Sequence, residues 1–224
     1  MRKTILFIIC LIICNQLLAA TAPTTIDSKA KKIAAGTHNL KPSIVKLAIG
    51  AFYNAQKLGI RVNKPIITVI DYSLPATEKR LWVVDLRQDR ILYASMVAHG
   101  KNSGGNYTKK FSNKVNSLQT SMGLFLTAST YFGKNGYSLR MKGLEKGVND
   151  KAELRAIVLH GAPYVRTTGK SKRLGRSWGC PAVEEPLAKP IINTIKNGTL
   201  ILAYSTDRAW KKHSPFINES SILI

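Results

Sequence analysis

The chain has 224 residues, which suits one domain of ordinary size and is too short for two comfortable ones. A hydrophobic content of 45% with 21% charged residues is typical of a packed globular chain and argues against wholesale disorder. Lysine and arginine number 34 against 12 acidic residues, so the formal net charge of +22 indicates an anionic partner: nucleic acid, an acidic membrane face or a charged cell wall.

The N-terminus has the pattern of a secretory signal peptide. Two basic residues precede an uncharged apolar run from Thr4 to Leu18, which ends in small residues at Ala19 and Ala20. The run is shorter than the ~20 residues that a membrane-spanning helix needs, so we expect residues 1–20 to be cleaved rather than to anchor the chain. We therefore expect export to the periplasm or cell envelope, with no stable membrane span after cleavage.

Export makes nucleic acid a less natural partner, and the chain offers no helix-turn-helix, zinc-finger or RNA-binding signature. We expect an envelope polymer instead. Cys10 and Cys14 lie in the predicted signal peptide, which leaves Cys180 as the single thiol of the mature chain. Such a cysteine is either a buried small hydrophobe, an intermolecular link or a reactive thiol, and its position alone does not choose among them.

The predicted elements begin with an N-terminal region, residues 21–64. Residues 21–41 are polar and basic without a sustained period, so we expect a tether. Pro42 then opens a predicted helix whose apolar residues follow the 3.6-residue period until Gly59. We interpret the apolar stripe of this helix as a packing face.

Residues 65–204 form the predicted main domain. Short β-rich runs dominate it, at 66–72, 81–86, 91–98, 124–128, 156–160 and 199–204, with predicted turns at 87–90 and 133–136. A helix is expected over 184–196, and residues 205–224 are a C-terminal extension without an assigned structure. The pattern predicts a mainly β fold with flanking helices.

The densest group of reactive side chains combines a histidine at a strand end with the single thiol. If the basic loop after His160 doubles back, it brings His160 beside Cys180, and an imidazole within hydrogen-bond reach converts a thiol into a nucleophile. Nearby arginine charges are expected to lower the thiol pKa. Gly179 would let a substrate carbonyl approach and let nearby amides face an oxyanion. The structural alternatives are a turn glycine and a locally hydrogen-bonded histidine.

The sequence around these residues resembles the bacterial L,D-transpeptidases with a YkuD-type catalytic domain, whose signature is His-Gly, a loop and Ser-x-Gly-Cys. The matching residues are His160-Gly161 and Ser177-Trp178-Gly179-Cys180, and the resemblance extends over about residues 66–204. It implies a β-sandwich or barrel with a short helix after the cysteine. It also implies a thioester intermediate and exchange of peptide bonds in peptidoglycan stem peptides, without a metal or organic cofactor.

The resemblance also assigns roles to individual residues. Cys180 would be the nucleophile and His160 the general base, oriented by the backbone carbonyl of Gly161. The amides of Gly179 and Cys180 would help to form the oxyanion hole. Ser177 would be a hydrogen-bonding support for this turn.

Two positions depart from the family pattern. Many members have His or Lys in place of Trp178, and Arg or Asn in place of Ala182, so substrate contacts made by those groups are absent or relocated here. Arg173 and Arg176 are candidates to supply the positive charge for a substrate carboxylate, and Trp178 is a candidate pocket wall or packing residue. His99 precedes a glycine-rich loop and is a candidate substrate-binding residue, the alternative being a locally hydrogen-bonded loop histidine.

The sequence therefore predicts an exported transpeptidase that attacks a tetrapeptide stem, releases D-alanine and passes the acyl group to an amine. Hydrolysis of the acyl-enzyme, as in an L,D-carboxypeptidase, and a non-catalytic cationic wall-binding module are the alternatives. Papain-like or amidase enzymes fit less well, because their histidine usually follows the cysteine and only His213 follows Cys180. His38 and His213 have no partners in a metal-ligand spacing, so we expect no metal site. The acceptor amine and the oligomeric state stay open.

Overall fold

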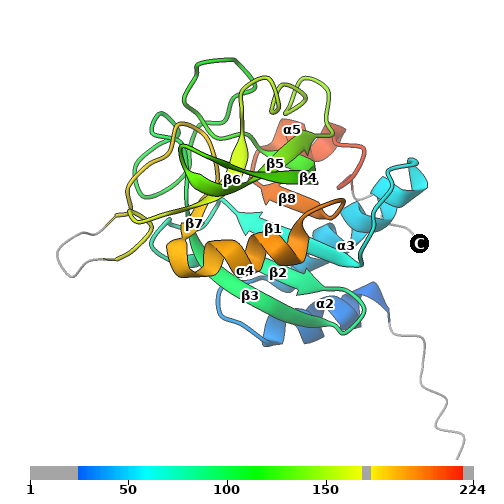
Figure 1. Ribbon diagram of the computed structural model, residues 1–224. Coiled ribbons are helices and arrows are strands. Elements are labelled where there is room, and N and C mark those ends of the chain that lie inside the picture. The colour runs from blue at the N-terminus through cyan, green and yellow to red at the C-terminus, as the bar shows by residue number, and fades with distance from the viewer. Residues whose placement is uncertain (1–24, 168–172, 219–224) are drawn as a thin grey trace, which may run out of the picture.

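A closed β-barrel forms the centre of the computed structural model, which describes residues 25–167 and 173–218. The strand order around the barrel is β1-β2-β3-β7-β6-β5-β4-β8 (Figure 1). The strands are β1 (Ile66–Asp71), β2 (Lys79–Asp85), β3 (Arg90–Ala98), β4 (Gly123–Gly133), β5 (Gly136–Gly143), β6 (Val158–Ala162), β7 (Ala182–Glu184) and β8 (Leu200–Tyr204). The helices are α2 (Ile26–Ala35), α3 (Pro42–Lys57), α4 (Glu185–Ile195) and α5 (Arg208–His213). The predicted mainly β fold with flanking helices is confirmed.

The strands pair antiparallel except at two places, β1 with β8 and β6 with β7. The parallel β6–β7 pair positions the candidate site, since it sets His160 opposite Ala182, two residues after Cys180. The loop between β6 and β7 thus does double back, as the spacing of the two motifs requires.

The two largest of three apolar clusters hold the barrel. Ile67 and Val69 of β1 pack in the cluster that contains α2 and α3, whereas Ile66 and Ile70 pack in the cluster that contains α4. Because helices cover both faces, every residue of β1 is buried, and the strand is mostly apolar rather than alternating, with Thr68 and Asp71 as its polar residues. In Figure 1, α4 crosses the front of the barrel and α2 lies below it.

The N-terminal region differs from the expected tether, because α2 forms within it. Thr25 caps the helix by accepting a hydrogen bond of 3.2 Å from the Ser28 amide. Ala30, Ile33 and Ala34 bury one face of the helix, whereas Lys31 and Lys32 are exposed. The apolar face has only a few residues, so the basic composition of the segment predicted a tether instead of a helix.

The C-terminal extension is partly structured. Its helix α5 buries Trp210, which is 4% exposed, and Phe216 and Ile217 join the same core cluster as α3. The Nδ2 atom of Asn54 on α3 donates a 2.9 Å hydrogen bond to the Phe216 carbonyl. None of the helices within the described ranges is long and apolar enough to cross a membrane.

Candidate active site

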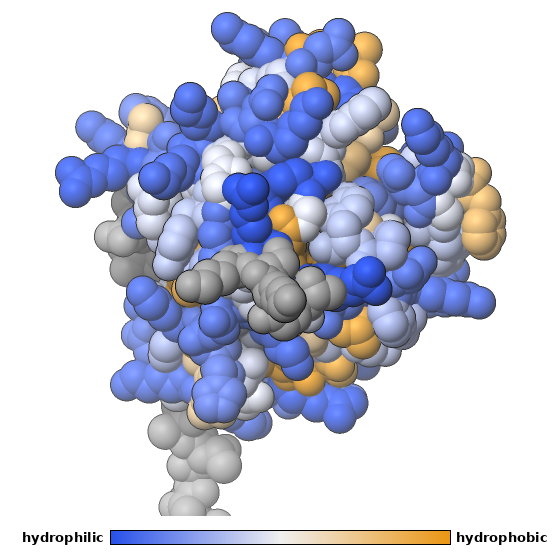
Figure 2. Space-filling model, turned by 90° about the vertical axis from the view of Figure 1, so that its left-hand side faces the viewer, coloured by the Kyte–Doolittle hydropathy of each residue, from blue (hydrophilic) through white to orange (hydrophobic). Residues whose placement is uncertain are grey.

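Cys180 and His160 line one pocket of about 330 Å³. The sequence predicted three more of its wall residues, Arg176, Ser177 and Trp178, but not Lys134, Asn135, Arg155, Ala156 and Tyr164. The face turned toward the viewer in Figure 2, to which the loops around β6 and β7 project, is mostly hydrophilic. The pocket therefore combines one thiol and one imidazole with several cationic side chains.

The ring of His160 is oriented by a backbone acceptor. Its Nδ1 atom lies 2.8 Å from the carbonyl oxygen of Gly161. A carbonyl only accepts hydrogen bonds, so Nδ1 carries the proton and Nε2 of the neutral ring is left as the acceptor. Burial lowers the pKa of His160, and the Gly161 carbonyl opposes this in part. The imidazole is therefore neutral at pH 7 and able to take a proton.

The thiol of Cys180 is half-buried against the segment that leads into β6. Its Sγ atom accepts a 3.5 Å hydrogen bond from the Val158 amide and lies 3.6 Å from the carbonyl oxygen of Ala156. Burial raises the pKa of Cys180, while the Val158 amide and the Arg155 charge lower it. The expected lowering of the thiol pKa by a nearby arginine charge is present for Arg155, but desolvation outweighs it, so the net shift is upward.

The turn before Cys180 is closed by Ser177, which donates a 2.6 Å hydrogen bond to the Cys180 carbonyl and accepts one of 3.1 Å from the Gly179 amide. The φ angle of Gly179 is 130°, and a Cβ atom there would lie 2.8 Å from the Gln119 carbonyl oxygen, so only glycine fits. The Gly179 amide would have to leave Ser177 before it could bind an oxyanion, and that role stays a prediction.

His99 is fully buried and supports the site through its backbone. Its carbonyl accepts a 3.0 Å hydrogen bond from the Ser177 amide. Its Nδ1 atom lies 2.9 Å from a guanidinium nitrogen of Arg80, which can only donate, and Nε2 lies 3.4 Å from the Gly104 carbonyl. Burial, then the charges of Arg80 and Arg176, lower the pKa of His99 to about 4. The ring is not among the walls of the Cys180 pocket, so contact with substrate stays a prediction.

The cationic candidates occupy different places. Arg176 lines the pocket, and its guanidinium donates to the carbonyl groups of Gly104 and Gly105. Its positive charge is therefore at the pocket, but some of its N–H groups are already used in hydrogen bonds within the protein. Arg173 is exposed. Trp178 is 69% exposed, with Lys101 Nζ 5.8 Å and Lys134 Nζ 5.9 Å from its ring centre. Trp178 is thus a pocket wall rather than a packing residue.

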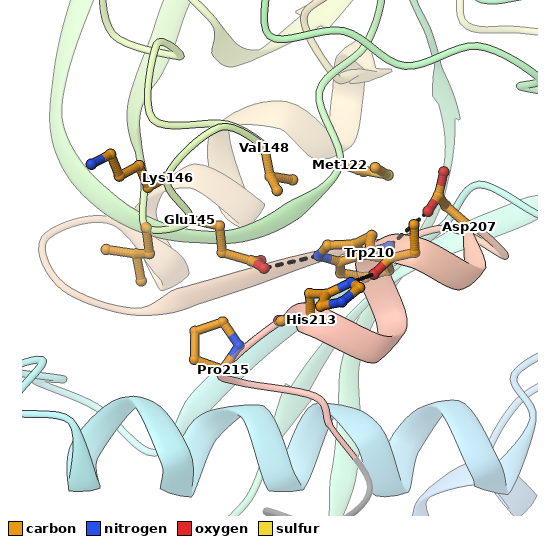
Figure 3. A pocket seen from close by; sticks show the side chains of 11 residues that line it. Met122, Glu145, Lys146, Val148, Asp207, Trp210, His213 and Pro215 are labelled. Atoms are coloured by element: carbon orange, nitrogen blue, oxygen red, sulfur yellow. Dashed lines mark hydrogen bonds between the residues drawn. The ribbon is translucent and has the colours of Figure 1, made fainter.

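A second, larger pocket of about 630 Å³ lies between α5 and the loop after β5 (Figure 3). The carboxylate of Glu145 accepts hydrogen bonds of 2.6 Å from the Leu124 amide and 2.9 Å from Trp210 Nε1. Asp207 caps α5 by accepting a 2.7 Å hydrogen bond from the Trp210 amide. These contacts tie the C-terminal segment to the barrel.

Over residues 25–167 and 173–218, no three His, Cys, Asp or Glu side chains are grouped so as to hold a metal ion. The predicted signal peptide lies outside the described residues.

Residues 36–204 match the YkuD_2 family of L,D-transpeptidase catalytic domains, and the protein belongs to this family. L,D-transpeptidases of this family act on peptidoglycan stem peptides. No curated protein matches the chain.

Solved structures similar to the chain are L,D-transpeptidases at low identity. One from Mycobacterium smegmatis has 15% identity and a TM-score of 0.40, covering 63% of this chain and 59% of that one. One from Mycobacterium tuberculosis H37Rv has 12% identity and a TM-score of 0.41, covering 63% and 58%. One from Stackebrandtia nassauensis has 14% identity and a TM-score of 0.37, covering 82% and 77%. The chain thus spans less than two thirds of the first two.

Proposed function

We propose that the protein is an exported, cysteine-dependent peptidoglycan L,D-transpeptidase. The observation that carries the proposal is the meeting of Cys180 and His160 in one pocket, with His160 Nε2 left as an acceptor by the contact of Nδ1 with Gly161. Family membership supports an enzyme of this kind. The signal-peptide pattern of residues 1–20 supports export, and the basic composition suits an anionic wall.

The raised pKa of Cys180 and the lowered pKa of His160 favour a neutral resting pair over a thiolate–imidazolium pair. The thiol then has to lose its proton to His160 as sulfur attacks the stem carbonyl. The C–S bond forms, the peptide bond to D-alanine breaks, and the leaving amine takes the proton back from His160. An acceptor amine next attacks the thioester, giving up a proton to His160, and the thiol is regenerated when sulfur leaves and takes that proton.

The test incubates the mature parent protein and Cys180→Ala with a tetrapeptide stem, with and without an acceptor amine, and weighs the products. The parent should release D-alanine and form the acyl-transfer product, and Cys180→Ala should do neither, because the described residues offer no second thiol. Binding to sacculi over a salt series is measured in parallel. It should weaken with salt to the same extent in both proteins, since exposed charges are screened over about 8 Å at physiological ionic strength.

Other results would change the assignment. Release of D-alanine without transfer would indicate a carboxypeptidase. Salt-sensitive binding by both proteins without turnover by either would indicate a binding module. Turnover by Cys180→Ala would overturn the mechanism. Export is checked separately by N-terminal sequencing of the protein recovered from the envelope, which should begin at Thr21 rather than Met1.

A further inference from the structure

Arg155 reaches the wall of the Cys180 pocket from the segment before β6. Its Nη2 atom lies 3.5 Å from the position that a Cβ atom on Gly179 would occupy, so the guanidinium packs against the residue that precedes the thiol. The charge of Arg155 favours the thiolate form of Cys180, and a thiolate in turn favours the charged guanidinium. The cation and the candidate nucleophile therefore influence each other directly.

The guanidinium of Arg155 is held in place by the loop 112–121. Nη1 donates to the Ser112 carbonyl and, over 2.5 Å, to the Ser121 hydroxyl. Nη2 donates to the Ser117 hydroxyl over 3.1 Å and to the Gln119 carbonyl over 2.6 Å. These four acceptors are uncharged, so they fix the planar guanidinium without neutralising its charge. Burial lowers the pKa of Arg155, but a guanidinium stays protonated in proteins.

Ala156 and Val158, which lie close to Arg155 in the chain, contact the sulfur. Ala156 has a φ of 51°, in the left-handed region that residues with a Cβ atom adopt uncommonly. Its carbonyl oxygen lies 3.6 Å from the Cys180 Sγ atom, and the Val158 amide donates to the same atom over 3.5 Å. One short segment thus supplies a carbonyl and an amide that contact the thiol, and a cation that lines the same pocket.

We propose that Arg155 is a positioning residue for Cys180: it ties the loop 112–121 to the turn of Gly179 and keeps a fixed positive charge beside the sulfur while His160 removes the proton. This inference rests on the nucleophilic role proposed for Cys180. Arg155 shares its pocket with other groups that affect the thiol: His160, Lys134, Tyr164 and Arg176. Tyr72 also interacts with the charge of a thiolate at this position.

The test is the pH dependence of alkylation of Cys180 by iodoacetamide, which needs no stem peptide. The mature full chain is compared with Arg155→Gln, Arg155→Lys and Ser117→Ala. Ser117→Ala is the matched control, because it removes one acceptor from Nη2 and leaves the charge. An opposite charge in the same pocket lowers a pKa by about 1–3 units, so the alkylation midpoint of Arg155→Gln should rise by at least about one pH unit. Arg155→Lys and Ser117→Ala should keep the parent midpoint.

Equal upward shifts in Arg155→Gln and Arg155→Lys would overturn the proposal, because they would show that only the bracing of the loop matters. An unchanged midpoint in Arg155→Gln would overturn it too. If Arg155→Gln does not fold, as judged by circular dichroism, Arg155→Met takes its place under the same expectations. This outcome can be distinguished from that of the proposed function. A parent protein that alkylates as expected but never forms an acyl-enzyme refutes the transpeptidase. Normal turnover by the parent with an unchanged alkylation midpoint in Arg155→Gln refutes only the role of Arg155.

Discussion

The Ser177 hydroxyl donates a 2.6 Å hydrogen bond to the carbonyl oxygen of Cys180, and this contact closes the turn that presents the thiol. The same hydroxyl accepts from the Gly179 amide. Ser177→Ala leaves both groups without this partner in a buried turn, so we expect the free energy of unfolding to fall by about 1–3 kcal/mol. Denaturant unfolding checks this, with the exposed Ser129 changed to Ala as the control, for which a change within about 0.5 kcal/mol is expected. Equal stabilities of the two variants would contradict it.

His160 should set the acidic limb of the pH–rate profile. The base must be neutral, and burial lowers the pKa of His160, so kcat/KM should fall with decreasing pH only below the ~6.5 of an ordinary histidine. The raised pKa of Cys180 means that the thiol loses its proton only at higher pH, which sets the basic limb. The profile should therefore have a broad plateau between the acidic and the basic limb. His160→Ala should lower kcat by about 10²–10⁴. A His99→Ala variant that lost acyl-enzyme formation while His160→Ala kept it would reverse the assignment.

His99 should make the fold sensitive to acid. Its pKa of about 4 in the folded protein lies below the ~6.5 of an unfolded chain, so the unfolded state binds more protons between these values. The free energy of unfolding should therefore fall as the pH drops from about 6.5 to about 4, by about 3 kcal/mol at most from this group. His99→Asn keeps an acceptor for Arg80 and does not titrate, so its stability should decline less over this range. His213→Asn on α5 is the control, and identical pH profiles for the two variants would count against the role of His99.

Lys101 and Lys134, whose Nζ atoms lie 5.8 and 5.9 Å from the ring centre of the exposed Trp178, should favour an anionic group on the donor stem. Changing both lysines to Met should raise KM for a carboxylate-bearing stem a few-fold at low salt, since exposed ion pairs contribute about 0.2–1 kcal/mol each. The difference should shrink at high salt. Lys211 and Lys212 on α5, both changed to Met, keep the net charge of the test variant and should leave KM unchanged. A similar rise in both double variants would show a general effect of charge.

The sequence predicted most of the barrel because buried strands are continuous apolar runs. β5 was missed, although Tyr137, Leu139 and Met141 alternate with polar residues as a half-buried strand requires. β7 has only three residues and depends on its pairing with β3 and β6. A strand that short leaves no periodic signal, so only the tertiary structure reveals it.

The candidate site was predictable only where a motif named its residues. Arg155 lay next to the predicted strand of His160, yet its position beside the thiol depends on the folding of the loop 112–121, which has no regular period. The contact of His99 with Arg80 could not be predicted, because the sequence does not show that Arg80 is buried against it. The net upward shift of the thiol pKa could not be predicted either, since desolvation is a property of the packed structure.

The attachment of α5 decides where the protein can be shortened for expression. The family match stops at residue 204, but Trp210 fills the core beyond that point and its indole holds the carboxylate of Glu145 (Figure 3). A chain cut at 204 would uncover apolar side chains of α3 and remove the Trp210 donor from the Oε2 atom of Glu145, leaving the Leu124 amide as a donor to Oε1. The exposed apolar surface and the carboxylate oxygen that has lost its donor would both favour aggregation. Recombinant work on the catalytic domain should therefore keep the chain through Asn218.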